Sequence, residues 1–219
     1  MKTLALRFLA IGLLAAYGVD DTVAQQATPG TRTSPTSRST HRRTYLSLGA
    51  GYSFIYSHEG IDEFWNGKIA GSVAFTVNIA NGVNLGVGVD AARIKFDRRA
   101  FYERFPTIPG QARDILMLNV YLAWRYTPFA RYRTAPFIGV DVGASHTTPA
   151  TYKEVIGGVR HVYYDIPAKT RLILSPVAGL TIYPVSWFAF EFQGKAVLHV
   201  NDPDFGLTVL ALGGLRIRL

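Results

Sequence analysis

The chain has 219 residues, of which 48% are hydrophobic and only 17% are charged, and its formal net charge is +8 at pH 7. Charged residues make up about 25% of an average soluble domain, so this composition is unusual for a water-soluble protein. The sequence contains no cysteine, which excludes disulfide bonds and thiolate metal sites as sources of stability.

The N-terminus predicts a signal peptide over residues 1–24. Lys2 and Arg7 accompany an apolar run at residues 4–17, which is too short to cross a bilayer as a helix. Small residues at 22–24 provide a cleavage site, although cleavage a few residues earlier also fits the pattern. An amphipathic N-terminal helix is the alternative. We therefore expect export through a bacterial secretory route.

Residues 25–43 predict a disordered, basic periplasmic leader. The stretch QQATPGTRTSPTSRSTHRR is rich in Ser, Thr and Pro and has no large apolar side chain, so it cannot offset its ordering entropy. A basic excess usually indicates nucleic-acid binding, but an exported chain seldom meets nucleic acid, and we expect no such partner. Anionic lipid or lipopolysaccharide is a more plausible partner for these basic residues. The simplest hypothesis is a solvated leader without a specific partner.

From residue 44 onward, alternating patterns predict eight strands. Each is about 10–14 residues long, twice the usual ~5–6, and a strand tilted by ~45° needs about 9–11 residues to cross a bilayer. The predicted strands cover about 45–56, 68–79, 83–95, 113–126, 136–145, 170–183, 187–199 and 207–219.

The connections between these strands alternate in length. Long connections at 57–67, 96–112 and 146–169 alternate with short turns, and only the last one, NDPDFG, departs from the trend. Long loops at one end and short turns at the other are typical of outer-membrane barrels. In the hairpin at residues 73–90, we expect Val77 opposite Leu85 and a three-residue loop, Ala80–Gly82, with Gly82 in the left-handed conformation.

The distribution of apolar and polar residues between the two faces of the predicted strands is the reverse of that in a soluble barrel. One phase is large and apolar on all eight strands, whereas the other is rich in Gly, Ser, Asn and Asp, too small for a solvated face. We expect the apolar phase to face lipid and the sheet to close, because unpaired backbone groups are not tolerated in lipid. Aromatic residues near the short-turn ends predict an interfacial girdle: Tyr45, Trp124, Tyr126, Phe129, Tyr132, Phe137, Tyr183, Trp187 and Phe188.

The signal peptide, the opening strand LGAGYSF, the eight alternating strands and the C-terminal strand resemble the eight-stranded outer-membrane β-barrel families of the OmpA-like, OmpX-like and PorT types. The resemblance covers about residues 44–219. It implies an all-β fold, an eight-stranded antiparallel up-and-down transmembrane β-barrel in a bacterial outer membrane, with periplasmic termini. It also implies the barrel-assembly machinery as a partner. Family members often end in Phe, whereas this chain ends in Leu219.

The small, polar phase also carries charged residues, which we expect to pair inside the lumen because unpaired buried charge is costly. Eight strands leave an interior just wide enough for side chains, which favours a plug of paired charges; a polar channel or proton path is the alternative. The expected lumen network comprises Lys68, Asp90, Arg125, Asp141, Arg171, Glu191, Lys195, Arg216 and Arg218.

The long connections are the expected place for surface contacts. The second interleaves arginine, which suits bidentate phosphate contact, with aromatic residues: Arg98, Arg99, Arg104, Phe101, Tyr102 and Phe105. Lipopolysaccharide or another envelope protein could bind there, and an ordinary solvated loop is equally consistent. The third contains VRHVYY, which could extend the following strand or form a small hairpin across Gly157-Gly158.

We expect no enzymatic activity, cofactor or metal site. His58, His146 and His161 lie in predicted connections, and adjacent residues such as Ser145 and His146 would point to opposite faces of a strand. The predicted function is structural or interactive: anchoring surface loops, or serving as a subunit of an envelope complex. The alternatives are a small porin-like channel for ions or small solutes, and a lipid A-modifying enzyme. A soluble lipocalin-like barrel would have an apolar lumen and a charged exterior, the reverse of the phases here.

Overall fold

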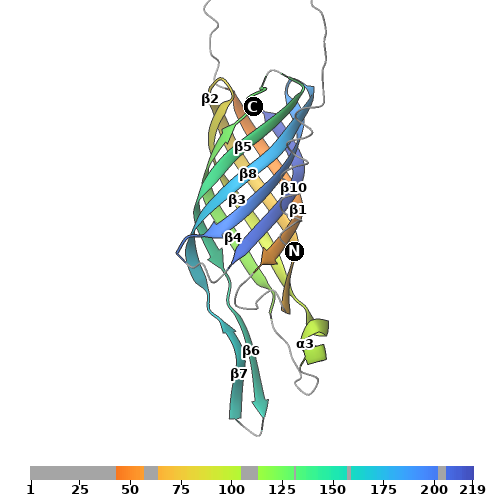
Figure 1. Ribbon diagram of the computed structural model, residues 1–219, viewed down its shortest axis with the longest axis vertical. Helices are drawn as coiled ribbons and strands as arrows, with labels where there is room; N and C mark the ends of the chain where they lie inside the picture. Colours follow the sequence, from red (N-terminus) through yellow and green to blue (C-terminus); the bar gives the residue numbers. More distant parts are fainter. Residues whose placement is uncertain (1–42, 57–63, 105–112, 131, 157–158, 202–205) are drawn as a thin grey trace, which may run out of the picture. The chain divides into compact units, whose positions relative to one another are not determined.

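Eight long strands close into a single antiparallel barrel in the order β1-β10-β9-β8-β5-β4-β3-β2 (Figure 1). This computed structural model describes residues 43–56, 64–104, 113–130, 132–156, 159–201 and 206–219, so the predicted signal peptide and leader lie outside it, apart from Arg43. The predicted fold class and all eight predicted strands are confirmed. The strands are β1 (Thr44–Tyr56), β2 (Trp65–Ala80), β3 (Val83–Phe96), β4 (Ile115–Tyr126), β5 (Thr134–Thr147), β8 (Lys169–Val185), β9 (Phe188–His199) and β10 (Leu207–Arg218).

Three further elements lie in the long connections. The strands β6 (Ala150–Ile156) and β7 (Val159–Ile166) pair antiparallel as a separate two-stranded sheet. This pairing confirms the hairpin alternative for the third long connection, although residues 157–158 lie outside the described part. A short helix, α3 (Arg98–Arg104), follows β3. No helix among the described residues is long and apolar enough to span a membrane.

The first and last strands complete the barrel by pairing with each other. Their register runs from Tyr45–Arg218 to Tyr56–Leu207 without a shift. The pairing continues to the end of the chain, where the Leu219 amide donates to the Thr44 carbonyl at 2.9 Å. Closure removes the unpaired edges that an open sheet would expose, so the backbone groups of every barrel strand have a partner strand on both sides.

The outward face of the barrel is apolar, as predicted. Burial along β4 alternates at every residue, with Val120 and Leu122 left 54% and 67% exposed. Keeping one such side chain in water rather than burying it costs about 1.5–3 kcal/mol, so this surface suits lipid and not water. We call it the apolar belt, and it includes Leu48, Tyr52, Phe54, Ile69, Val73, Phe75, Leu85, Val87, Val89, Leu116, Leu118, Val120, Leu122, Ile138, Val142, Leu172, Leu174, Phe190, Phe192, Leu198 and Leu215.

The predicted aromatic girdle is confirmed in part. Five aromatic residues near the short turns are exposed: Trp124, Tyr126, Phe129, Tyr132 and Trp187. The prediction is wrong for Phe137, which is 4% exposed and points inward, where it fills the space left by Gly179. Tyr45, Tyr183 and Phe188 are half-buried, and the Tyr45 ring lies under the Arg216 guanidinium.

The β2–β3 hairpin has the predicted register but a different turn. Val77 pairs with Leu85, and Gly82 has the predicted positive φ of 74°. The expected three-residue loop is wrong: Ala80 pairs with Val83, and the extra residue, Ile79, is a bulge inside β2. A bulge shifts the phase of a strand by one residue, so it provides the same offset as the third loop residue.

A charge placed in the middle of the apolar belt should destabilise the barrel in lipid. We expect Val120→Arg to cost about 2–4 kcal/mol, and Tyr126→Arg at the strand end about 0–1 kcal/mol, because the penalty falls with distance from the bilayer midplane. Urea unfolding of the two variants in phosphatidylcholine vesicles, followed by tryptophan fluorescence, measures the difference. Equal, small losses at both positions would contradict a lipid-facing belt.

Candidate functional site

An ion-pair network around Lys195 occupies the centre of the lumen. The Lys195 Nζ lies 3.0 Å from both Asp90 carboxylate oxygens and donates to Tyr121 Oη at 2.7 Å. It also lies 3.1 Å from Asp141 Oδ2, as an ion pair rather than an aligned hydrogen bond. The Tyr121 hydroxyl donates in turn to Asp90 Oδ1 at 3.0 Å. Because β9 adjoins none of β3, β4 and β5, Lys195 links opposite walls of the barrel.

Alternation along the strands and one glycine make this network fit. Asp90, Tyr121 and Lys195 are all in the inward phase of their strands, and each is almost completely buried. Gly88 leaves the space that the Tyr121 ring occupies, since a Cβ at Gly88 would lie only 2.5 Å from the ring carbon Cζ. A larger residue at position 88 would therefore displace the tyrosine from the network.

Arg125 completes the charge balance of the network. Its Nη1 donates to Asp141 Oδ1, which is also in the lumen, and to the Trp124 carbonyl at 3.0 Å. Arg125 and Lys195 carry two positive charges, and Asp90 and Asp141 carry two negative ones. The buried set is neutral as a whole, which is the condition under which charges are tolerated away from water.

A second buried pair lies nearer the short turns. Arg216 Nη1 donates to Glu191 Oε2 at 2.9 Å, and its Nη2 donates to Thr76 Oγ1 at 3.3 Å. The guanidinium carbon also lies 4.3 Å from the centroid of the Tyr45 ring. Ser47 donates to the same Glu191 oxygen at 3.5 Å. The pair is therefore held by contacts from β1, β2, β9 and β10.

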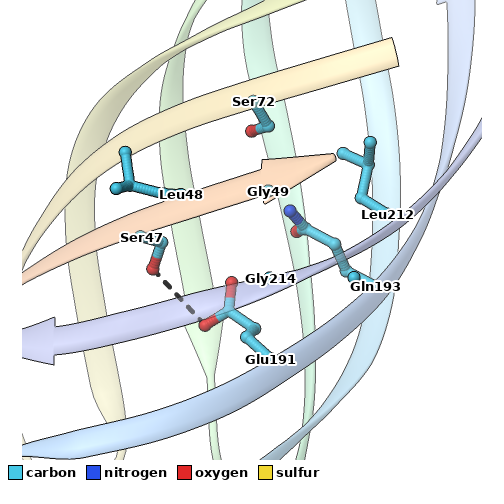
Figure 2. Close-up of a pocket in the computed structure, with 9 residues that line it drawn as sticks. Ser47, Leu48, Gly49, Ser72, Glu191, Gln193, Leu212 and Gly214 are labelled. Carbon is cyan, nitrogen blue, oxygen red and sulfur yellow. Dashed lines mark hydrogen bonds between the residues drawn. The ribbon is translucent and has the colours of Figure 1, made fainter. Parts of the chain in front are cut away.

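A small pocket lies beside this second pair (Figure 2). Figure 2 shows Ser47 and Glu191 facing each other, with Gln193 and Ser72 on the far side. The pocket has room for about one water molecule. It is lined by Ser47, Leu48, Gly49, Ser72, Glu191, Gln193, Leu212, Gly213 and Gly214. Side chains thus fill the lumen here rather than surround an open passage.

The remaining residues of the predicted network lie elsewhere. Arg171 is buried near the long connections, where its Nη1 donates to Thr147 Oγ1 at 2.8 Å. Lys68 and Arg218 are exposed, so their prediction as lumen groups is wrong. Lys68 lies within a bulge between Gly67 and Ala70, which reverses the direction of its side chain. Arg218 has the inward phase, but it lies at the end of β10, beyond the filled interior.

An apolar layer fills the lumen toward the long connections, which the sequence interpretation missed. Its signal was present, because the inward phase changes from polar to large apolar residues at that end of the strands. The layer consists of Ala70, Ala92, Ile94, Ile115, Met117, Ile173, Val197, Leu210 and Leu212, continued by the aromatic residues Phe64, Trp65, Phe96 and Phe101 and by Ala150 of β6. Tyr121, Ser47, Thr76 and Tyr45 were also missed, although the same alternation places them inside.

The helix α3 contributes to this layer and presents charge on its other face. Asp97 caps it, with Oδ1 accepting from the Arg99 and Ala100 amides at 3.0 and 3.2 Å. Phe101 was predicted as a surface contact, but it is 1% exposed and packs against Phe64 and Phe96. An apolar ring is more stable in this layer than in water.

The other predicted contact residues of this connection behave differently. Arg98, Arg99, Tyr102 and Arg104 are exposed. Arg99 Nε donates to Glu103 at 2.9 Å, and this hydrogen bond, with the charge of Glu103, raises the pKa of Arg99. Phe105 lies outside the described residues.

The two histidines whose side chains the structure describes, His146 and His199, lie on opposite faces of the barrel wall. His146 is exposed and its Nδ1 lies 3.0 Å from Thr170 Oγ1, while the neighbouring Ser145 is buried on the opposite face, as predicted. His199 is buried in the lumen. Within the described part of the chain, no group of three His, Asp or Glu side chains is placed to hold a metal ion. His58 lies outside that part.

Comparison with solved structures identifies the fold. Ail, the attachment invasion locus protein of Yersinia pestis, matches with a TM-score of 0.54 at 13% identity, covering 81% of this chain and 99% of that chain. Neisserial surface protein A (NspA) matches with a TM-score of 0.51 at 13% identity, covering 80% and 97%. No family model matches the chain, and no curated protein matches it. The chain has the fold of an eight-stranded outer-membrane β-barrel.

Removing the central cation should unbalance the lumen. We expect Lys195→Met to cost about 3–5 kcal/mol of folding free energy, because two carboxylates then share one arginine. The double variant Lys195→Met/Asp90→Asn restores neutrality and should cost less than the sum of its single variants, since the residues are coupled.

Urea unfolding in vesicles measures these differences. The exposed Arg218→Met removes the same charge outside the network, and as a control it should change stability by no more than about 0.5 kcal/mol. Additive losses in the double variant would show that Lys195 and Asp90 do not act as a pair.

Proposed function

We propose that the chain is a non-enzymatic integral protein of a bacterial outer membrane, with periplasmic termini and with its long connections at the cell surface. The apolar belt supports insertion into lipid, which is the principal partner, and the barrel-assembly machinery is the expected insertion route. The long connections all leave the same end of the barrel, opposite the end at which β1 begins and β10 ends, as in outer-membrane barrels generally.

The role we propose is structural and interactive, with a lumen that does not conduct. The observation that carries it is the filling of the lumen at successive levels: the Glu191–Arg216 pair, the Lys195 network and the apolar layer. A barrel whose interior is filled by its own side chains is a rigid support for the long connections at its surface. The exposed face of α3, with Arg98, Arg99 and Tyr102, is one surface available to lipopolysaccharide or to another envelope protein.

Single-channel recording in a planar bilayer tests the closed lumen. The folded chain should insert without producing steady open steps, under conditions in which a porin used as a positive control conducts. Insertion is verified separately by protease protection of the barrel. Reproducible steps of one amplitude would replace the plugged barrel with the alternative, a small channel for ions or solutes.

The absence of enzymatic activity is part of the same proposal. It is supported by the placement of Ser145 and His146 on opposite faces, and by the use of the buried carboxylates Asp90, Asp141 and Glu191 in ion pairs. Mass spectrometry of lipid A from cells with and without the expressed chain should give identical spectra. A new acylation or deacylation product would establish the lipid-modifying alternative.

A further inference from the structure

A bulge in β2 turns Lys68 away from the lumen. Gly67 pairs with Ile94 and Ala70 pairs with Ala92, so β2 has one more residue than β3 over this interval. As a result, Lys68 and the next residue, Ile69, are both exposed, while Ala70 is buried in the apolar layer. Bulges re-aim side chains at functional positions. Without this one, the phase of Ala70 would place the Lys68 ammonium inside the apolar layer.

Lys68 joins two outward-facing cations on the neighbouring strand. Lys95 pairs with Asn66, and Arg93 lies opposite the bulge that contains Lys68. All three side chains are exposed. Among the described residues, neither lysine has a hydrogen-bond or ion-pair partner. Two strands thus present three adjacent cations, which we call the β2–β3 cationic patch.

The two described carboxylates near this patch, Asp114 and Asp97, are already engaged. Asp114 Oδ2 accepts from Arg93 Nε at 2.7 Å, and its Oδ1 accepts from the Phe96 amide at 3.0 Å. Burial alone would raise the pKa of Asp114, but these bonds and the charges of Arg93 and Lys95 outweigh burial and lower the pKa. Asp97 caps α3 and accepts from the Asn66 amide at 3.0 Å. Among the described residues, Lys95 acts on Asp114 only through its charge and neither lysine forms an ion pair, so both ammonium groups are accessible to a ligand.

The patch lies at the edge of the apolar belt. Lys68 directly precedes Ile69, the last belt residue of β2 toward the long connections, and Ile69 is 64% exposed. On β1, Tyr52 pairs with Ile69, and the exposed rings of Phe54 and Tyr56 continue beyond it. Aromatic rings beside cations at the end of a lipid-facing surface mark the level of the lipid headgroups.

We propose that Lys68, Lys95 and Arg93 form a binding site for the phosphates of lipid A, the membrane-embedded part of lipopolysaccharide. This inference rests on the proposed function, which places the long connections in the outer leaflet. The aliphatic and aromatic neighbours suit acyl chains and sugar rings, and lysines bind phosphate as point charges. Because the patch is on paired strands rather than on a loop, the backbone positions of the two lysines are fixed before the lipid binds.

Titration of the folded, detergent-solubilised chain with bis-phosphorylated lipid A tests the site. The double variant Lys68→Gln/Lys95→Gln should raise the apparent dissociation constant roughly 10- to 30-fold, since each lysine near an anionic surface contributes about fivefold. The double variant Arg43→Gln/Arg218→Gln removes the same charge from exposed positions at the opposite end of the barrel. It should bind as the unchanged chain does.

Two comparison lipids separate the sources of phosphate. Dephosphorylated lipid A should bind the unchanged chain as weakly as the lysine variant binds lipid A. If phosphatidylglycerol binds as tightly as lipid A and depends equally on the two lysines, the assignment to lipid A is wrong. Equal binding by the Lys68/Lys95 variant and the unchanged chain would overturn the site itself. Both results leave the barrel and its closed lumen intact, whereas failure of the chain to insert in membranes would refute the proposed function.

Discussion

Closure of the sheet through the β1–β10 pairing is the constraint from which the other features follow. Lipid offers no partner to a backbone amide or carbonyl, so a membrane-spanning sheet must satisfy all of them internally. Closing with eight strands also sets the width of the interior, which is just enough for side chains. The interior therefore has to be filled with groups of the right volume, and the charges among them have to cancel.

Paired charges fill the lumen at one level, and apolar side chains fill it at another. Toward the short turns and in the middle, glycines provide space, and paired charges such as Lys195 with Asp90 cross the lumen. Toward the long connections, the inward phase becomes apolar, and Phe101 of α3 extends that layer beyond the strands. The Lys195 ion pairs join β9 to β3 and β5, which are not its neighbours, and this favours one register and one cross-section of the barrel. The apolar layer supplies hydrophobic stabilisation that the lipid-facing surface cannot provide, since lipid is as apolar as the side chains it meets.

The strands and their faces could be predicted from the sequence, because a two-residue period is a strong signal over long strands. The bulges at Ile79 and at Lys68–Ile69 could not, since each shifts the phase without changing the composition of the strand. That is why Lys68 was assigned to the wrong side. Asp90 and Lys195 were assigned to the inside by alternation alone, but their pairing across the barrel depends on the tilt and stagger of the strands. Phe101 was misplaced because a loop has no periodicity to show which of its aromatic residues packs inward.

The central claim is that this closed barrel resides in a membrane with its apolar belt against lipid. Cell fractionation combined with gel electrophoresis of boiled and unboiled samples tests it most directly, because a closed barrel resists unfolding in detergent until it is heated. The account predicts that the chain is recovered in the outer-membrane fraction and migrates at different positions before and after boiling. Recovery in the soluble periplasmic fraction, with the same migration in both samples, would contradict it.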